Sequence, residues 1–224
     1  MRQTLRALTA EFVGVFILVF IGGGAIIINT LRPDSLGLVG IALAYGLAYG
    51  LAVTTALAGS GGHVNPAVTI GLWSVGRIAW RRAGLYVLAQ LAGAVVAALV
   101  LEAVFPGGAG QVAQYGAVTV ATEISTGQAV AVEGVLTFFL ALAMMATVVD
   151  TEAPRLAGWG LGLTVLIGVL TGGPLTGAAL NPARALGPAI VSSFWTAQAV
   201  YWIGPIVGAI VAMQVYERVL RKKD

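Results

Sequence analysis

The chain has 224 residues, of which 58% are hydrophobic and 9% are charged, and it contains no Cys and a single His. Soluble globular domains carry about 25% charged residues, so this composition excludes a soluble domain and indicates an integral membrane protein forming one domain, residues 1–224. The lack of Cys and the single His also exclude a disulfide scaffold and Cys-ligated or multi-His metal sites, and we expect neither a metal nor a cofactor.

Taken in chain order, apolar runs long enough to cross a bilayer predict six transmembrane helices, at about 8–29, 37–58, 83–105, 129–149, 157–173 and 197–217. Two further apolar runs, 65–75 and 181–191, are too short to span and are expected to enter the membrane as half-helices. The first run is too long for a signal peptide and lacks a convincing cleavage site. The fold class is therefore an all-α membrane protein with six transmembrane helices and two half-helices.

The basic residues are concentrated on one side of these spans. Ten of them share that side: Arg2, Arg6, Arg77, Arg81, Arg82, Arg155, Arg218, Arg221, Lys222 and Lys223. By the positive-inside rule both termini are cytoplasmic, and we expect a multi-pass protein of the cell membrane. The connection 106–127 lacks Lys and Arg and should be extracellular. The basic residues behind the net charge of +3 thus lie at the edges of the membrane, and we expect no nucleic-acid partner.

The two halves of the chain, about 8–105 and 129–217, repeat one another. Glu11 and Glu133 occupy corresponding places in the first span of each half, and residues 86–94 match residues 201–209. Three spans per half is an odd number, so the second copy must be inverted relative to the first. Inverted repeats with broken helices build a site near the membrane midplane. Small residues spaced by four, such as Gly46 and Gly50, indicate close helix packing.

Each half carries one Asn-Pro-Ala motif, Asn65-Pro66-Ala67 and Asn181-Pro182-Ala183, directly before its half-helix. Asn is a strong N-cap and Pro suits the first helical position, so each motif predicts a helix start. One copy is weak evidence because Asn-Pro is common in turns, whereas two copies at matching places are far more specific. Two helix N-termini that meet at the midplane create a positive potential that repels protons and cations.

The duplicated motif, its lead-in Ser60-Gly61-Gly62-His63, the trailing Arg184 and the paired Glu residues resemble the aquaporin, or major intrinsic protein, family over about residues 8–217. The resemblance implies a passive transmembrane channel for water that excludes protons and ions. It also implies a homotetramer with one pore per subunit. Glu11 and Glu133 would then support the non-helical loops that lead into the half-helices, with a hydrated interfacial position as the alternative. We interpret His63 as a further loop support.

The same resemblance places Tyr45, Val169, Ala178 and Arg184 around the narrowest point of the pore. Water-selective members usually have a His where Val169 stands, so a channel for water plus small neutral solutes, such as glycerol or metalloid hydroxides, is the alternative. Against this, Ala185 is not the Asp of glycerol facilitators, and Tyr201-Trp202 is an aromatic pair of the water-channel kind.

Two other classes of function fit the sequence less well. A secondary transporter also uses inverted repeats and broken helices, but six spans are few and the sequence offers no obvious intramembrane ion site beyond Glu11 and Glu133. An intramembrane enzyme is not expected, because the chain has neither an H-E-x-x-H nor a G-x-S-x-G motif.

Overall fold

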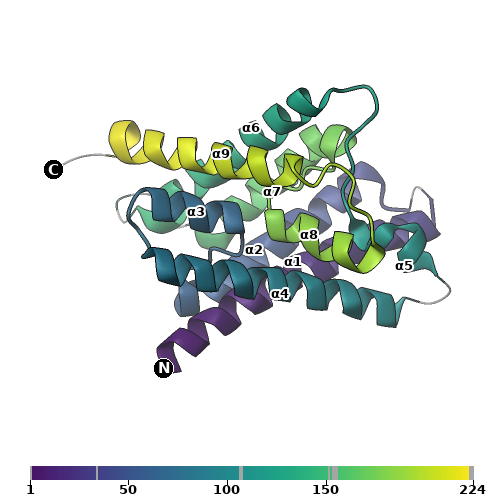
Figure 1. Cartoon of the computed structure of the whole chain (residues 1–224), viewed down its shortest axis with the longest axis horizontal. Helices are drawn as coiled ribbons and strands as arrows, with labels where there is room; N and C mark the ends of the chain where they lie inside the picture. Colours follow the sequence, from purple (N-terminus) through teal and green to yellow (C-terminus); the bar gives the residue numbers. More distant parts are fainter. Residues whose placement is uncertain (1, 34, 106–107, 151, 153–155, 222–224) are drawn as a thin grey trace.

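A computed structural model describes residues 2–33, 35–105, 108–150, 152 and 156–221. Within these residues all regular structure is helical (Figure 1), and six helices are long and apolar enough to cross a membrane. They are α1 (Arg2–Leu31), α2 (Gly37–Ser60), α4 (Trp80–Val104), α6 with its last turn η2 (Thr126–Val149), α7 (Ala157–Thr176) and α9 with its last turn η3 (Val200–Leu220). The six predicted spans are confirmed, with ends that differ by a few residues.

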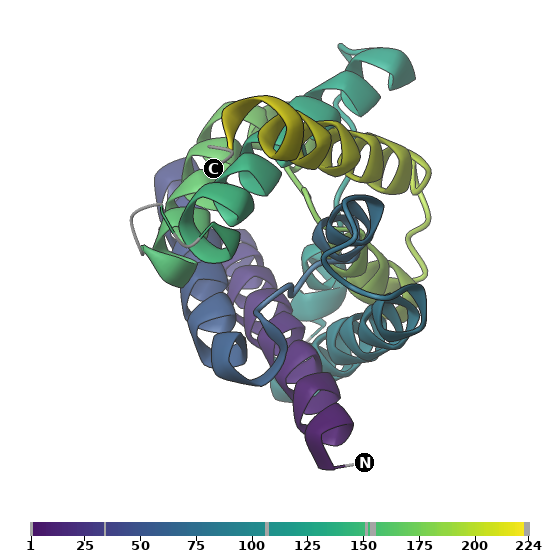
Figure 2. The same cartoon turned by 90° about the vertical axis from the view of Figure 1, so that its left-hand side faces the viewer.

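Two short helices, α3 (Pro66–Ser74) and α8 (Pro182–Ser192), are the predicted half-helices. They lie one after the other between α4 and α9 (Figure 1), and the view along the long axis places α3 inside the ring of longer helices (Figure 2). Between the halves the chain forms α5 (Ala109–Val112) and the turn η1 (Gln114–Gly116). The half-helices are thus enclosed by the spans, where their ends can face each other.

The contacts between helices follow the repeat. In the first half α1 packs on α2 and α4, and in the second half α6 packs on α7 and α9. The half-helices pack across the repeat, α3 on α9 and α8 on α4, while α2 on α7 joins the halves. Both ends of the chain lie at the same end of the molecule (Figure 1), as an even number of spans requires.

Glycines let these helices approach closely. On α2, a Cβ added to Gly46 would lie 2.8 Å from the carbonyl oxygen of Gly162 on α7, and one added to Gly50 would lie 3.4 Å from that of Gly158. Gly208 on α9 meets Gly134 on α6 in the same way, because a Cβ on Gly208 would collide with the Gly134 carbonyl. The glycines spaced by four therefore pack backbones together, as small residues do in lipid.

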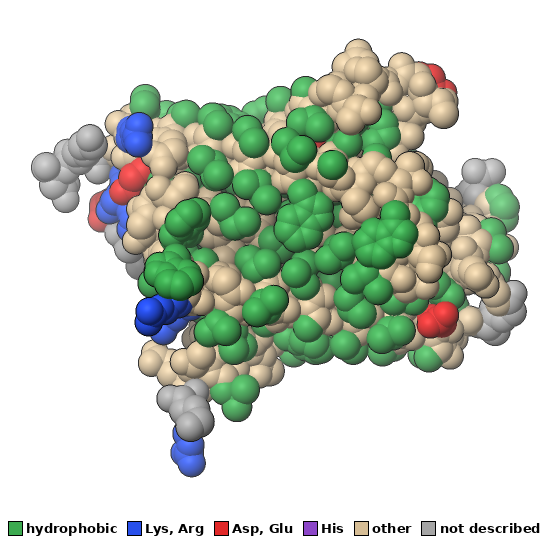
Figure 3. All heavy atoms as spheres, in the orientation of Figure 1, with side chains coloured by type: hydrophobic (Ala, Val, Ile, Leu, Met, Phe, Trp, Pro, Cys, Tyr) green, Lys and Arg blue, Asp and Glu red, His purple; other side chains and the backbone are tan. Residues whose placement is uncertain are grey.

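The surface separates into an apolar middle and a charged end. Hydrophobic side chains cover the middle of the molecule, and Lys and Arg gather at the end that carries both termini (Figure 3). Exposed side chains such as Leu47, Leu88, Leu163 and Ile203 belong to the apolar middle. Of the basic residues assigned to the cytoplasmic side, Arg155, Lys222 and Lys223 lie outside the described residues.

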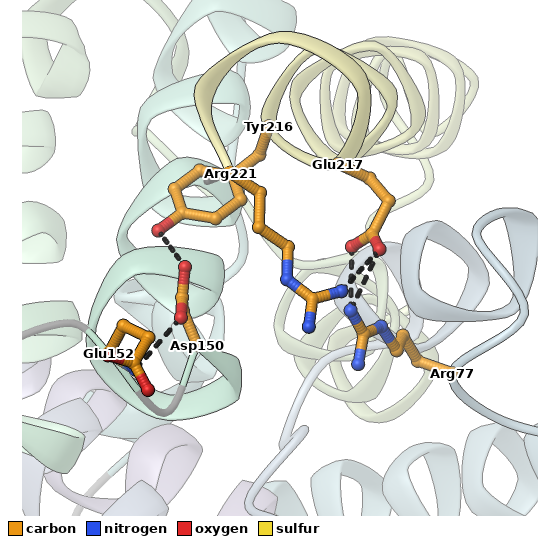
Figure 4. A network of polar contacts seen from close by, with 6 residues as sticks. All are labelled: Arg77, Asp150, Glu152, Tyr216, Glu217 and Arg221. Carbon is orange, nitrogen blue, oxygen red and sulfur yellow. Dashed lines mark hydrogen bonds and ion pairs between the residues drawn. The ribbon is translucent and has the colours of Figure 1, made fainter. Parts of the chain in front are cut away.

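At the charged end, a polar network ties three segments together (Figure 4). Arg77, which follows α3, and Arg221 both pair with Glu217, at 2.8 and 2.7 Å. The Tyr216 hydroxyl donates to Asp150 at 3.0 Å. The backbone N–H of Glu152 and this hydroxyl hold the pKa of Asp150 below its usual value. Ion pairs this exposed contribute about 0–1 kcal/mol each, so the network orders the helix ends more than it stabilises the fold.

Candidate functional site

Both half-helices start as the Asn-Pro-Ala motifs predict. The Asn65 side-chain oxygen accepts from the backbone N–H of Ala67 at 2.8 Å, and the Asn181 oxygen accepts from Ala183 at 3.0 Å. A proline occupies the first turn of each helix, where no backbone N–H partner is needed. Each helix therefore begins at its Asn, and the positive end of its dipole lies there.

The two motifs are held to each other across the repeat. The Asn65 amide donates to the carbonyl of Leu180 at 2.8 Å, and the Asn181 amide donates to the carbonyl of Val64 at 2.8 Å. Both Asn side chains are buried. An amide NH₂ has two N–H groups, so each Asn keeps one donor beyond this cross-link. The two N-termini thus meet inside the molecule, each with a spare donor.

Two buried carboxylates hold the loops before the half-helices. Glu133 accepts from the backbone N–H groups of Ala179 and Leu180 at 2.9 and 2.8 Å and from the Thr176 hydroxyl at 2.7 Å. Glu11 does the same for the first loop. It accepts from the backbone N–H groups of His63 at 3.0 Å and Val64 at 2.7 Å and from the Ser60 hydroxyl. Both carboxylates have no exposed surface.

The loops need this support because their backbone is strained. Val64 and Leu180, the residues directly before the two Asn, have φ of 52° and 53°, and Ala178 has φ of 44°. Residues other than Gly rarely adopt this left-handed region, and a β-branched Val there is a clear outlier. Such a conformation persists only where its surroundings impose it. The carboxylates bind the N–H groups of Val64 and Leu180 and thereby aim both Asn side chains.

The first loop has a further polar brace, Gln90, that the sequence did not reveal. Gln90 on α4 donates to Glu11 at 2.6 Å and to the Thr69 hydroxyl at 3.0 Å. His63 contacts the same Thr69 hydroxyl through Nδ1 at 3.1 Å, and its ring meets Tyr86 edge-on. His63 therefore lies in a hydrogen-bonded cluster beside the first motif. A Gln inside an apolar span is the sequence signal that could have pointed to Gln90.

Arg184, in the first turn of α8, forms a buried bridge to two other segments. Its Nη1 donates to the carbonyl of Gly116 at 2.7 Å, and its Nη2 donates to the Tyr45 hydroxyl at 2.6 Å. The guanidinium carbon lies 4.7 Å from the centre of the Tyr45 ring, within cation–π range. The ring itself rests on α1 at Gly22, where an added Cβ would collide with it. These partners explain how a cation is held near a helix N-terminus.

Tyr45, Val169 and Arg184 line one cavity of about 310 Å³ between the helices and the connection 117–121. Its other walls include Ile26, Leu38 and Ile41. Ala178 packs in the same hydrophobic core as Val169. Among the described residues, however, Ala178 is not part of the lining of this cavity. The structure therefore brings a guanidinium and a phenol against a wall that is apolar apart from Thr119. This arrangement suits a small neutral molecule with a polar edge.

Comparisons with known proteins all point to one family, and each match covers nearly the whole chain. The family model described as Major intrinsic protein matches residues 1–216. Aquaporin TIP4-4 of Zea mays is 42% identical over 95% of this chain and 86% of its own length, and Aquaporin NIP1-4 of Oryza sativa subsp. japonica is 38% identical over 95% and 76%. The X-ray structure of the aquaglyceroporin from Plasmodium falciparum superposes with a TM-score of 0.88 at 29% identity, covering 97% of both chains.

Proposed function

The chain belongs to the major intrinsic protein family, that of the aquaporins, and from this premise we propose that it is a passive pore for water that excludes protons and ions. A membrane channel for water or small solutes, and not an enzyme, follows from the family alone. The observation that carries the finer proposal is the pair of Asn residues held head to head by reciprocal hydrogen bonds.

The proposed mechanism follows from the donors at this point. Asn65 and Asn181 each have one N–H left, and each caps a helix whose N-terminus carries about half a positive charge. A water molecule whose oxygen accepts from both amides has its hydrogens turned along the pore, which interrupts a proton-relaying chain of waters. The same positive potential repels cations. A neutral molecule meets neither barrier.

A second candidate, a channel for water plus small neutral solutes, is favoured by the constriction. Val169 offers no polar group opposite Arg184, and within the described residues the Arg184 Nε has no hydrogen-bond partner. A solute such as glycerol or an undissociated metalloid hydroxide could place its hydroxyls on the guanidinium and its carbon or central atom on the apolar wall. The structurally similar Plasmodium falciparum protein is described as an aquaglyceroporin.

We expect proteoliposomes containing the protein to shrink several times faster than empty ones after a stopped-flow osmotic jump, with a low activation energy. Glycerol used as osmolyte should then enter slowly and reverse the shrinkage. Val169→His should narrow the constriction, remove this second phase and leave water flow largely intact. Shrinkage no faster than that of empty vesicles would contradict the water channel, and flux driven by an ion gradient would favour a secondary transporter.

We also propose that both termini are cytoplasmic, in the cell membrane, and that four copies assemble with one pore each. Arg77 pairs with Glu217 near the C-terminus, and Arg81 and Arg82 follow it in the first turn of α4, which supports this orientation by the positive-inside rule. A largely apolar groove between α6 and α7, lined by residues such as Val135 and Leu175, offers a face that a helix of a second copy can cover.

We expect native mass spectrometry of the membrane-extracted protein to give four times the subunit mass of 22.8 kDa. The same measurement after harsher detergent should release the single subunit. A monomer as the largest species under mild extraction would contradict the tetramer without affecting the pore.

A further inference from the structure

Tyr49 on α2 carries a buried hydroxyl without a partner. The other five tyrosine hydroxyls of the chain each make a hydrogen bond: Tyr45, Tyr86, Tyr115, Tyr201 and Tyr216. Tyr49 is 1% exposed, and its hydroxyl makes no hydrogen bond to any described residue. An unsatisfied buried polar group costs about 1–3 kcal/mol, which Phe at this position would avoid. The hydroxyl therefore needs a purpose other than packing.

Along α2, Tyr49 lies between two parts of the proposed pore. One turn towards residue 37, Tyr45 contacts Arg184 at the constriction. One turn the other way, Val53 packs against Gly62 in the loop before Asn65, since a Cβ on Gly62 would lie 3.0 Å from the Val53 side chain. At a rise of about 1.5 Å per residue, Tyr49 lies about 6 Å from either along the helix axis. It therefore lies between the constriction and the motif loop.

The Asn65 side chain lies near the Tyr49 phenol, within range to interact with its hydroxyl, but the two groups do not reach hydrogen-bond geometry. The Asn65 side-chain oxygen accepts from Ala67 and one of its amide N–H groups donates to Leu180, so the second N–H is available to a permeating molecule. A phenol hydroxyl both donates and accepts. Asn65 can thus donate to the oxygen of a passing molecule while Tyr49 accepts one of its hydrogens. Around them the core is aliphatic, with Val53 and Val64 among its members.

We propose that Tyr49 is a specificity-determining residue of the pore, whose hydroxyl binds the O–H of the permeating molecule beside Asn65 and whose ring narrows the path there. The proposal rests on the proposed channel function. Tyr49 thereby forms a second selectivity site, between the Arg184 constriction and the loop before Asn65. This site favours water and small hydroxylated solutes over molecules that have no hydroxyl hydrogen to donate.

The location is tested by a single thiol, because the chain has no Cys of its own. Tyr49→Cys, treated with mercuric chloride in proteoliposomes, should gain one mercury by mass and lose at least about four-fifths of its water flow, as expected when a bulky ion occupies a single-file path. Leu47→Cys, at an outward-facing position, should be labelled without loss of flow. A position 49 thiol that stays unlabelled, or that is labelled with flow unchanged, overturns the location.

The role of the hydroxyl is tested by Tyr49→Phe, which keeps the ring. We expect water flow to fall about fivefold, the rate equivalent of one typical net hydrogen bond. Tyr216→Phe removes a hydroxyl at the charged end of the molecule, far along the chain from the motif, and should leave flow unchanged. Flow of Tyr49→Phe equal to or above that of the parent overturns the hydroxyl's role. A parent that conducts no water would instead contradict the channel function, while mercury labelling would still report whether position 49 is reached.

Discussion

Glu133→Ala is expected to destabilise the protein strongly and to abolish water flow. The change leaves the backbone N–H groups of Ala179 and Leu180 and the Thr176 hydroxyl without their acceptor. Each unsatisfied buried donor costs about 1–3 kcal/mol, so the total loss is about 3 kcal/mol or more. In a chain of this length that lowers the melting temperature by roughly 6–12 °C. The left-handed Leu180 then loses its restraint, and Asn181 is no longer aimed at the first motif.

The measurement is thermal unfolding in detergent together with osmotic shrinkage. Glu123→Ala removes an exposed carboxylate from the connection before α6. It should change neither the melting temperature nor the rate of shrinkage by a measurable amount. Glu133→Gln keeps one acceptor oxygen and should fall between the parent and Glu133→Ala. If Glu133→Ala melted and conducted like the parent, the carboxylate would not be what holds the second loop.

The parts of the fold that depend on length and local chemistry were predictable from the sequence. Bilayer thickness separates the six long apolar runs from the two short ones, and the structure has both classes at the expected places. Asn before Pro predicts a helix start because of the N-cap bond and the missing N–H, and Asn65 and Asn181 make that bond. These features involve residues only a few positions apart.

The parts that depend on contacts between distant segments were not predictable in the same way. The residues around the constriction were assigned by resemblance, but the direct bond between Arg184 and Tyr45 joins helices from different halves. The Gly116 carbonyl that holds Arg184 is a backbone atom, and every residue has one, so no residue type marks it. The unpartnered Tyr49 hydroxyl became visible only once its surroundings were known. An aromatic residue in an apolar span otherwise predicts packing alone.

Arg184→Val is expected to raise cation and proton conductance about a hundredfold while water flow persists. A fixed charge about 6 Å from a passing cation contributes about 3 kcal/mol of repulsion at an effective dielectric constant of about 20, and that energy corresponds to about a hundredfold in rate. Arg184 is 2% exposed, so bulk water and salt screen its charge little. Planar-bilayer currents under a cation or pH gradient, recorded beside osmotic water flow from the same preparation, measure both quantities.

Two controls separate the charge of Arg184 from its hydrogen bonds. Arg32→Val removes an exposed cation at the end of α1, where solvent screening should leave conductance at the parent level. Arg184→Lys keeps the charge but cannot reach the Tyr45 hydroxyl and the Gly116 carbonyl at once with a planar fork. It should therefore still exclude cations while its passage of neutral solutes changes. Conductance of Arg184→Val at the parent level would assign ion exclusion to the two helix N-termini alone and leave Arg184 with the orientation of neutral solutes.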